Sequence, residues 1–525
     1  MAAVVPRRVS RGWPLGLTRN AVILISIVVF GFVIRSYRLT GPSLWFDESF
    51  SWAVTRFPAP ELIERIAADN NPPLYFLTLQ TWIRLFGDSV ASMRGLSVLC
   101  GCAATVGIYL FASEAYKRDD LGAAESSTTL DANSIAWIAA LFVSLNAGQI
   151  IWAKEMRGYA LGTALAAFSS WLLFRALSRP RAMGSWITLG LVNLAFLYTH
   201  YYAMFSVAAQ ALFVAAYLFF GRNPSAAPKR EVVRGAGIAF GIAACGFMPW
   251  IPILLRQRAQ VQADFWTGPL AVDQFTFATN ELLFGKNDAY GPIVPQIVAV
   301  LHVLVILSLF WRLRIADAYL LTAILVPIAL SALSTKFDTK IITPRYFLFA
   351  HLFFLVAAAR LVCRIRETGF RRTVVAVLVA NALFIWSEYF SGLHLDDRPG
   401  GRGAMAYLDE HRTKGEPVIT CSPLLHYSLL YYTHDRNGWY VNDDPEFPLS
   451  HYRGKPLVRP SELISMQGME RLDRQYAWVA DMQSGWTHGH VRVPSHWTRV
   501  SQEEFPEVYN LQGTTILTKY RVKAN

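Results

Sequence analysis

Long apolar stretches separated by short polar loops run through the first 390 residues of the chain. Apolar stretches of this length predict helices that cross a lipid bilayer. We predict eleven such helices, at residues 21–37, 92–116, 134–149, 157–177, 185–199, 201–220, 235–255, 294–312, 316–333, 346–362 and 373–390. The pattern therefore predicts a polytopic α-helical membrane protein.

Two shorter helices are predicted in the loop at 39–93, between the first and second spans. At 60–68, a proline in the first turn is followed by apolar residues on one face and charged residues on the other. This arrangement predicts a helix that lies flat on the membrane surface. The apolar run at 73–86 is short for a crossing, so we predict a re-entrant or interfacial helix there.

The hydropathy pattern changes after the last span. From Ser391 to Asn525 the chain is polar, with short apolar runs at 417–421, 476–480 and 514–522 that predict β-strands. The segments 404–411 and 424–432 are predicted to be helical. We therefore predict two parts, a transmembrane domain at 1–392 and a small α/β domain at 393–525.

Basic residues concentrate in alternate loops between the spans, and short basic loops usually face the cytoplasm. Placing the N-terminus in the cytoplasm puts these loops inside and puts the 39–93 loop and the α/β domain outside. The basic residues in question are Arg179, Arg181, Arg222, Lys229, Arg230, Arg234, Arg312, Arg314, Arg364, Arg366, Arg371 and Arg372.

Composition supports this class. Of the 525 residues, 53% are hydrophobic and only 16% are charged, which excludes an ordinary soluble domain. The formal net charge of +12 could suggest nucleic acid. Because much of that charge lies in the short loops, we interpret it as an orientation signal and expect no nucleic-acid partner. Only one of five cysteines, Cys421, lies in the polar tail, so no disulfide framework is predicted there.

The candidate chemistry begins with two adjacent carboxylates, Asp47 and Glu48, directly after the first span. They stand among aromatic residues, which favour the level of the lipid headgroups. A partly desolvated carboxylate is costly, and such groups are often functional. The alternative is a solvated acidic pair beside a membrane anchor.

Other polar and aromatic residues fall on the same predicted outer side, whereas the predicted inner loops are mostly short. This asymmetry predicts an extracytoplasmic working face. The candidates are Asp69, Asn70, Asn71, Tyr75, Arg94, Glu155, Arg157, His200, Tyr201, Arg345 and Tyr346.

Several short motifs occur in a recognisable order: Leu-Trp-Phe-Asp-Glu at 44–48, Asn-Asn-Pro-Pro-Leu-Tyr-Phe at 70–76, Ala-Lys-Glu-Met-Arg-Gly-Tyr-Ala at 153–160, Thr-His-Tyr-Tyr at 199–202 and Thr-Pro-Arg-Tyr at 343–346. The set resembles the protein O-mannosyltransferase and aminoarabinose transferase superfamily of integral-membrane GT-C glycosyltransferases. The resemblance implies a GT-C fold, a polyprenyl-phosphate-linked sugar donor and a catalytic acid in the first outer loop. Similarity to the bacterial branch further implies an undecaprenyl carrier and the bacterial inner membrane.

Transfer of a sugar from a phosphate carrier needs a base for the acceptor and cations for the departing phosphate. We predict Asp47 as the general base, with Glu48 as an orienting residue or a contact to the donor sugar. Arg345, with Tyr346 beside it, is the predicted ligand of the lipid phosphate. Arg94 and Arg157 are further candidates, and each could equally be an ion-pair partner for Glu48 or Glu155.

The remaining candidates line the predicted substrate pocket, and several have alternative roles. Asp69 could end a helix or act as a second acid. His200 could contact the sugar, bind a metal or be an interfacial histidine. Aminoarabinose transferases tend to carry an acid and a lysine before the Pro-Pro pair, where this chain has Asn70 and Asn71. We therefore predict no metal-ligand set, and assistance by Mg²⁺ or Mn²⁺ stays open, as does the sugar.

Two other functions compete with the transferase. The chain could be a membrane protein that binds or assembles envelope polymers through its α/β domain. It could also be a secondary transporter, which would predict ionisable residues near mid-membrane and an internal repeat. The candidate charges cluster at the outer interface instead. For the transferase, the acceptor could be an envelope glycan, a lipid or a protein.

Overall fold

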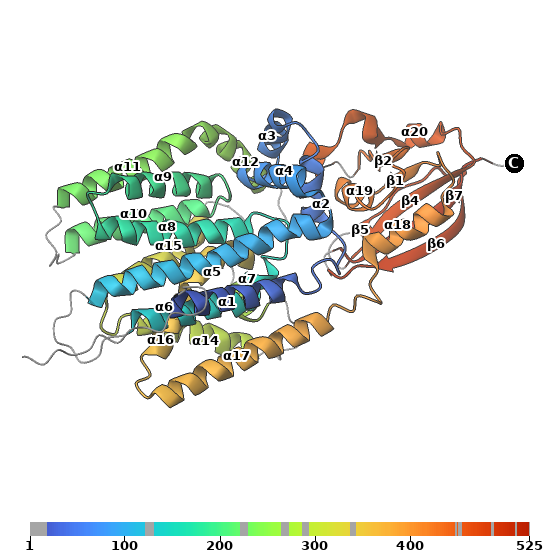
Figure 1. Cartoon of the computed structure of the whole chain (residues 1–525). Helices are drawn as coiled ribbons and strands as arrows, with labels where there is room; N and C mark the ends of the chain where they lie inside the picture. The colour runs from blue at the N-terminus through green and yellow to red at the C-terminus, as the bar shows by residue number, and fades with distance from the viewer. Residues whose placement is uncertain are drawn as a thin grey trace, which may run out of the picture.

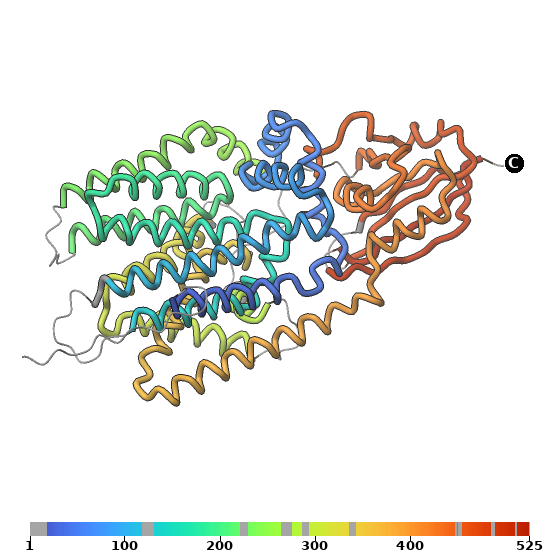
Figure 2. The backbone as a smooth tube through the Cα atoms, viewed as in Figure 1, coloured from blue at the N-terminus to red at the C-terminus, as the bar shows by residue number. Residues whose placement is uncertain are grey.

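The computed structural model describes residues 18–120, 131–220, 229–263, 272–285, 293–335, 343–446, 449, 454–484, 488–509 and 512–523. Figure 1 shows a bundle of long helices with an α/β domain at one end, and Figure 2 traces the chain through both parts. The chain is a polytopic helical membrane protein with a small C-terminal α/β domain.

All eleven predicted spans correspond to helices. Among the described residues, eight helical stretches are long and apolar enough to cross a membrane, and α6, α9 and α14 are shorter apolar helices. The helices are α1 (Arg19–Ser36), α5 (Val90–Asp120), α6 (Ala132–Leu145), α8 (Tyr159–Ser178), α9 (Met183–Leu197), α10 (Ala203–Phe220), α11 (Lys229–Phe247), α14 (Ile293–Ser308), α15 (Ile315–Thr335), α16 (Leu348–Cys363) and α17 (Thr368–Ser391).

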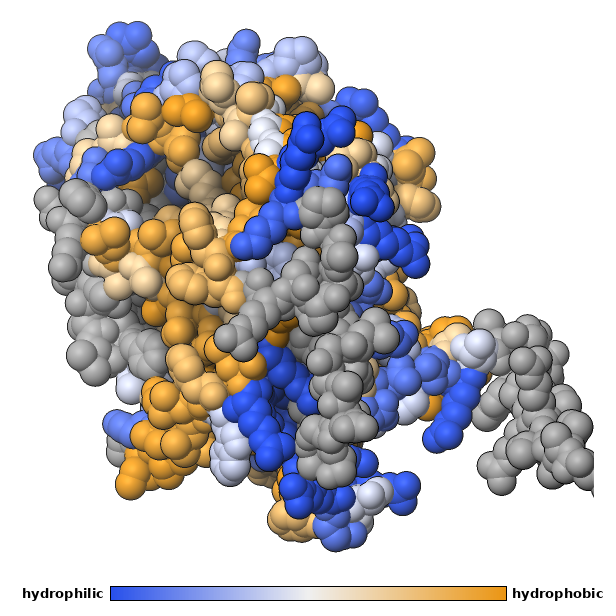
Figure 3. Space-filling view, turned by 90° about the vertical axis from the view of Figure 1, so that its left-hand side faces the viewer, coloured by the Kyte–Doolittle hydropathy of each residue, from blue (hydrophilic) through white to orange (hydrophobic). Residues whose placement is uncertain are grey.

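The loops between these helices separate into two groups at opposite ends of the bundle (Figure 1). Among the described residues, the connections after α8, α14 and α16 lie at the end remote from the α/β domain. Figure 3 looks onto that end, where hydrophilic residues stand among apolar ones. The predicted inner and outer loops are thus sorted to different ends, and which end faces the cytoplasm stays a prediction.

Two predicted helix boundaries were wrong. The stretch predicted as one span at 134–149 divides at Asn146, whose side chain accepts a hydrogen bond from Gln149 N (2.9 Å) and starts the separate helix α7 (Ala147–Ile151). The span predicted at 235–255 begins in α11, which ends at Phe247, and continues through η1 (Met248–Trp250) into α12 (Ile251–Ala263). Another helix, α13 (Val272–Phe284), lies between the spans predicted at 235–255 and 294–312. The Asn146 side chain competes for a backbone N–H group and so explains the first break. The proline in η1 explains the second break.

The 39–93 loop folds into three helices, α2 (Phe46–Val54), α3 (Ala59–Ala68) and α4 (Leu74–Phe86). The helices predicted at 60–68 and 73–86 are therefore present, and α2 was not predicted. The apolar residues Leu62 and Ile66 of α3 are fully buried in a hydrophobic cluster that also contains residues of the α/β domain. These two residues therefore pack against protein, and the predicted position of α3 flat on the membrane stays a prediction.

The α/β domain contains a mixed seven-stranded sheet with the main order β3-β2-β1-β4-β7-β6, and β5 pairs with β4. The β1–β2, β1–β4 and β2–β3 pairs are parallel, and β4–β7 and β6–β7 are antiparallel. The strands are β1 (Val418–Thr420), β2 (Trp439–Asn442), β3 (Leu463–Ile464), β4 (Tyr476–Gln483), β5 (His488–Gly489), β6 (Thr498–Pro506) and β7 (Thr514–Arg521).

The strands predicted at 417–421, 476–480 and 514–522 are β1, β4 and β7, and the predicted helices are α18 (Gly400–His411) and α19 (Pro423–Leu430). The sequence did not predict β2, β3, β5 or β6. The edge strand β6 is mostly exposed and polar, so it has no apolar alternation that could reveal it.

The α/β domain packs directly against α2, as Figure 1 shows for α19. The Ser428 hydroxyl donates to Ser49 Oγ (2.9 Å), and Leu44 N donates to the Tyr432 hydroxyl (2.8 Å). Trp52 and Leu429 belong to one buried hydrophobic cluster. The helix that carries Asp47 is therefore held by the α/β domain as well as by the bundle.

A buried carboxylate in the α/β domain gives a testable pH dependence. Glu507 Oε1 accepts a hydrogen bond from Gly401 N (2.7 Å) at the start of α18. Burial raises the pKa of Glu507 from 4.5 to about 7, although hydrogen bonds from Gly401 and Thr515 act in the opposite direction. Between pH 4.5 and 7 the folded protein keeps a proton that the unfolded chain has released, so the free energy of unfolding falls as pH rises through this window.

Glu507→Gln is expected to flatten this pH dependence and to stabilise the domain at pH 8 by up to about 3 kcal/mol. Glutamine still accepts the Gly401 N–H bond but has no charge to bury. The measurement is thermal unfolding of the full chain in detergent at pH 5 and pH 8. Glu504→Gln, an exposed change on β6, should leave the dependence intact; an unaltered pH slope in Glu507→Gln would contradict the assignment.

Candidate active site

Asp47 and Glu48 lie in the first turn of α2, and their side chains face different surroundings. The positive end of a helix dipole favours carboxylates at this position. The Asp47 side chain is 28% exposed, whereas that of Glu48 is 1% exposed. Neighbouring helical residues point about 100° apart. The Asp47 side chain therefore lies on a partly exposed side of α2, whereas the Glu48 side chain points into the protein.

Glu48 forms a buried two-pronged ion pair with Arg94 of α5. Arg94 Nε lies 2.8 Å from Glu48 Oε1, and Nη2 lies 2.6 Å from Oε2. Arg94 also donates to the carbonyl oxygens of Leu39 (2.7 Å), Pro42 (3.0 Å) and Ser43 (3.1 Å). The pair therefore fixes the chain that leads into α2.

The same carboxylate also holds the segment that precedes α8, because Met156 N donates to Glu48 Oε1 (3.1 Å). Of the two roles open to Arg94, the structure favours ion pairing with Glu48 over binding of a lipid phosphate. For Glu48 it favours the orienting role over contact with a donor sugar, because both carboxylate oxygens are engaged and buried.

Two arginines converge on Asp47 from distant parts of the chain. Arg157 Nε lies 3.8 Å and Arg345 Nη1 lies 3.7 Å from Asp47 Oδ2. Arg157 lies just before α8, and Arg345 lies in η2 (Pro344–Phe347). These contacts are longer than the 2.7–2.9 Å of strong charge-assisted hydrogen bonds, so the carboxylate is attracted by both cations without being tightly bound by either.

Aromatic rings support both guanidinium groups. The Arg345 guanidinium lies 5.6 Å from the ring centre of Trp152 and 5.8 Å from that of Tyr159. The Arg157 guanidinium lies within 6 Å of the Phe50 and Phe76 rings. Cation–π attraction of this kind positions a guanidinium group through its face.

His200 joins this group from the turn between α9 and α10. Its ring lies 5.2 Å from the Tyr346 ring, and Nδ1 accepts a hydrogen bond from Tyr202 N (3.2 Å). Burial lowers the pKa of His200 to about 3, and Arg157 and Arg345 act in the same direction. The imidazole is therefore neutral, and because Nδ1 accepts, Nε2 carries the proton.

Asp69 is a second buried acid close to the site. It ends α3 and is 4% exposed, and the Asn71 side-chain amide donates to Asp69 Oδ2 (2.8 Å). Burial raises the pKa of Asp69 to about 6, although hydrogen bonds from Asn70 and Asn71 and the charge of Arg157 oppose the shift. Both predicted roles of Asp69, helix end and second acid near Asp47, are compatible with this position.

Three predicted pocket residues lie within the surrounding framework, where Tyr75 and Glu155 are buried and Tyr201 is partly buried. The Tyr75 hydroxyl lies 3.2 Å from Ser97 Oγ of α5. The Tyr201 hydroxyl accepts a bond from Trp250 Nε1 (2.9 Å) and donates to Gln257. Glu155 is 2% exposed and lies within electrostatic range of Arg345. Tyr75 and Tyr201 therefore bond to framework residues, and their predicted contact with substrate stays a prediction.

Sequence reasoning missed the aromatic residues around the arginines, including Trp152 and Tyr159. Both lie within or next to the motif at 153–160. Their proximity in the sequence to Arg157, which was predicted on the outer side, is the signal that could have identified them. Lys154 was also missed: its ammonium group donates to the Tyr37 carbonyl oxygen (2.5 Å) and lies 4.6 Å from the Phe390 ring centre. Burial lowers the pKa of Lys154 to about 7.

The residues of the site were also candidates for binding a metal ion. Within the described ranges, no group of three or more His, Cys, Asp or Glu side chains is arranged to hold a metal ion. Asp47 and Asp69 are the nearby carboxylates, and Asn70 and Asn71 occupy the positions before the prolines. Participation of a divalent cation stays open.

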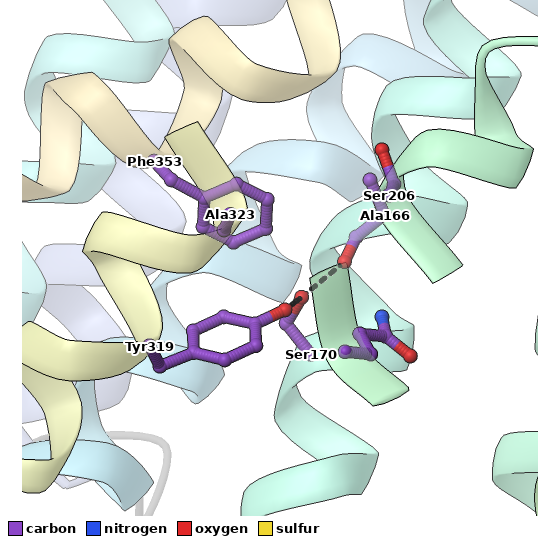
Figure 4. Close-up of a pocket in the computed structure, with 7 residues that line it drawn as sticks. Ala166, Ser170, Ser206, Tyr319, Ala323 and Phe353 are labelled. Atoms are coloured by element: carbon purple, nitrogen blue, oxygen red, sulfur yellow. Dashed lines mark hydrogen bonds between the residues drawn. The ribbon is translucent and has the colours of Figure 1, made fainter. Parts of the chain in front are cut away.

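Polar groups buried elsewhere in the bundle pair with one another. Figure 4 shows Tyr319 of α15 beside Ser170 of α8, with their hydroxyl oxygens 2.5 Å apart, and Ser170 donates to the Ala166 carbonyl oxygen (2.7 Å). The space among these side chains does not admit a water-sized molecule. In the first turn of α15, Asp317 is paired with Arg360 of α16. These groups join helices and do not form a substrate site.

Comparisons with known proteins identify the fold. No model of a protein family and no curated protein matches the chain. The structure of ArnT from Cupriavidus metallidurans bound to undecaprenyl phosphate matches with a TM-score of 0.57 at 10% identity, over 95% of this chain and 97% of ArnT. The apo ArnT structure gives a TM-score of 0.54 at 12% identity, over 95% and 98% of the two chains.

The oligosaccharyltransferase AglB from Archaeoglobus fulgidus gives a TM-score of 0.48 at 10% identity, over 78% of this chain. The chain spans 63% of the length of AglB. The ArnT match alone supports the assignment: the chain has a GT-C fold, including the C-terminal α/β domain. The predicted resemblance to this superfamily is confirmed at the level of the fold, and the chain is an integral membrane protein.

Proposed function

We propose that the chain is an inverting glycosyltransferase that moves a sugar from a polyprenyl-phosphate donor to an extracytoplasmic acceptor, with Asp47 as general base. The convergence of Arg157 and Arg345 on Asp47 is the observation that carries this proposal. The GT-C fold supports it, because the matching ArnT structure was solved with undecaprenyl phosphate bound. The donor sugar and the acceptor class stay open.

In the proposed reaction an acceptor hydroxyl or amine gives its proton to the Asp47 carboxylate. The acceptor atom attacks the anomeric carbon as the bond from that carbon to the phosphate oxygen breaks. This single displacement inverts the anomeric centre. The electron pair of the broken bond stays on the polyprenyl phosphate, whose increased negative charge is stabilised by Arg345 and Arg157.

The distances suit such an exchange of partners. At 3.7 and 3.8 Å, the arginines hold Asp47 less tightly than Arg94 holds Glu48 at 2.6 and 2.8 Å. A phosphate that binds these two guanidinium groups therefore competes at Asp47 with contacts that are longer than those of the Arg94–Glu48 pair. The neutral His200 offers an N–H donor to the sugar or phosphate without adding charge. No step of the proposal needs a metal ion.

Arg345→Met is expected to lower donor cleavage by at least about 100-fold, the usual cost of removing one preorganised group that stabilises developing charge. Arg345→Lys should recover only part of the rate, because an ammonium group lacks the two-pronged geometry of a guanidinium. The measurement is release of free polyprenyl phosphate from polyprenyl-phosphate sugars by protein in lipid.

The matched control is Arg366→Met, which removes an exposed arginine at the opposite end of α16. This control should retain wild-type release. Equal losses in both variants would indicate a general effect of lost charge, and full activity of Arg345→Met would remove Arg345 from phosphate binding.

A further inference from the structure

Four arginines gather where the 39–93 loop meets the α/β domain, and we call Arg56, Arg65, Arg436 and Arg459 the arginine seam. Arg56 and Arg65 come from the loop, and the other two come from connections within the α/β domain. Figure 1 shows these two parts side by side, with α2 and α3 next to the domain. Arg56, Arg436 and Arg459 are exposed.

Two buried aromatic rings organise the seam. The guanidinium groups of Arg56 and Arg436 lie 5.0 and 5.4 Å from the centre of the Trp52 ring. Those of Arg65 and Arg459 lie 3.8 and 5.0 Å from the centre of the Phe57 ring. Each ring thus brings together one arginine from the loop and one from the domain. Stacking occupies the guanidinium faces. The N–H edge of Arg65 already donates to Glu61 and to the Pro456 carbonyl oxygen, so the edges that can meet another ligand are those of Arg56, Arg436 and Arg459.

The acids near the seam are already engaged. Glu61 pairs with Arg65 (2.7 Å), and Glu462 accepts hydrogen bonds from Arg459 N (2.8 Å) and the Tyr427 hydroxyl (3.0 Å). Asp88 accepts a bond from Trp52 Nε1 (3.3 Å).

In contrast to these acids, three arginine side chains of the seam are not engaged in hydrogen bonds with other described residues. In the described part of the chain, no acceptor lies within hydrogen-bonding distance of the guanidinium groups of Arg56, Arg436 and Arg459. Partial desolvation lowers the pKa of Arg56, and the charges of Arg436 and Arg459 lower it further, whereas Glu462 opposes the shift. Like charges are therefore held together at the surface, where an anion would relieve their repulsion.

The seam is fixed relative to the candidate active site. Asp47 lies at the start of α2, and Arg56 follows the end of this helix, which is about 13 Å long. The Ser428–Ser49 and Leu44–Tyr432 hydrogen bonds attach the α/β domain to the same segment. A ligand that contacts both places must therefore be extended, as a glycan chain is and a compact lipid headgroup is not.

We propose that the arginine seam binds an acidic glycan through its carboxylate or phosphate groups. Binding at the seam would hold the chain so that a sugar farther along it reaches Asp47 as the acceptor. The second part rests on the proposed transferase function, and glycan binding itself does not. The proposal thus assigns the acceptor to the class of anionic envelope glycans.

The test is equilibrium binding to the purified full chain in phosphatidylcholine nanodiscs, with fluorescent polygalacturonate, phosphorylated dextran and neutral dextran as probes. The wild type should bind at least one acidic probe and not neutral dextran, and added salt should weaken binding. Arg56→Gln/Arg436→Gln should bind roughly tenfold more weakly, since each exposed ion pair contributes modestly. The matched control Arg499→Gln/Arg521→Gln removes two exposed arginines from β6 and β7 of the same domain and should bind like the wild type.

Two results would overturn the proposal: no binding of either acidic probe by the wild type, or equal losses in the seam and control variants. Binding to phosphatidylglycerol vesicles without binding to the acidic glycans would instead make the seam a membrane contact. If the double variant does not fold, Arg459→Gln provides a single exposed change. Asp47→Asn should still bind the acidic probe, so failure of the transferase proposal is distinguishable from failure of the seam.

Discussion

Asp47→Asn is expected to lower sugar transfer by about 10²–10⁴-fold, the range that general bases contribute. Asparagine has nearly the same shape but cannot accept the acceptor proton. The fold should be retained, because the Asp47 side chain is 28% exposed and its contacts with Arg157 and Arg345 are 3.8 and 3.7 Å long. The measurement follows release of polyprenyl phosphate from a panel of polyprenyl-phosphate sugars by protein in lipid.

The matched control for this prediction is Glu64→Gln, which neutralises an exposed carboxylate on α3 in the same loop. It should leave release unchanged, and thermal unfolding should show that both variants are folded. Release by the wild type that collapses in Asp47→Asn would also identify the donor. Equal release by the wild type and Asp47→Asn would remove Asp47 from the mechanism and direct attention to Asp69.

Arg94→Met is expected to reduce the free energy of unfolding by about 3–5 kcal/mol, because it leaves the charge of Glu48 buried without its partner. The side chains of this pair are 3% and 1% exposed. The variant also removes the donor to the carbonyl oxygens of Leu39, Pro42 and Ser43. The measurement is denaturant or thermal unfolding in detergent, followed by tryptophan fluorescence.

Two comparisons make the second prediction specific. Glu61→Gln alters the Arg65–Glu61 pair, whose side chains are 18% and 40% exposed, and should cost at most about 1 kcal/mol. Glu48→Met/Arg94→Met removes both buried charges and should recover part of the stability lost in Arg94→Met. Similar small effects for Arg94→Met and Glu61→Gln would contradict a structural role for the buried pair.

The two adjacent acids therefore have separate expected effects, one on activity and one on stability. The motif alone could not assign these roles, because they depend on the directions in which the side chains of Asp47 and Glu48 leave α2. Glu48 is buried because α5 places Arg94 against it. Asp47 lies on a side of α2 that stays partly exposed.

The sequence by itself determined the class of protein, the approximate positions of all eleven spans and the presence of a C-terminal α/β domain. Apolar length alone is enough to define a span, because a lipid bilayer has a fixed hydrocarbon thickness. The ordered motifs also indicated the GT-C superfamily, and three strands were apparent from short apolar runs. These signals are local, and each can be recognised within a few tens of residues.

Only the tertiary structure decided which candidates meet. Arg157 and Arg345 lie far apart in the chain, and packing of α8 and α16 brings both to Asp47. Packing also pairs Arg94 with Glu48 and bonds the hydroxyl groups of Tyr75 and Tyr201 to neighbouring side chains. The edge strand β6 and the burial of Leu62 and Ile66 of α3 against other parts of the protein could not be predicted either. Long-range packing determines these features, and a local pattern of residues does not record which distant surface will cover it.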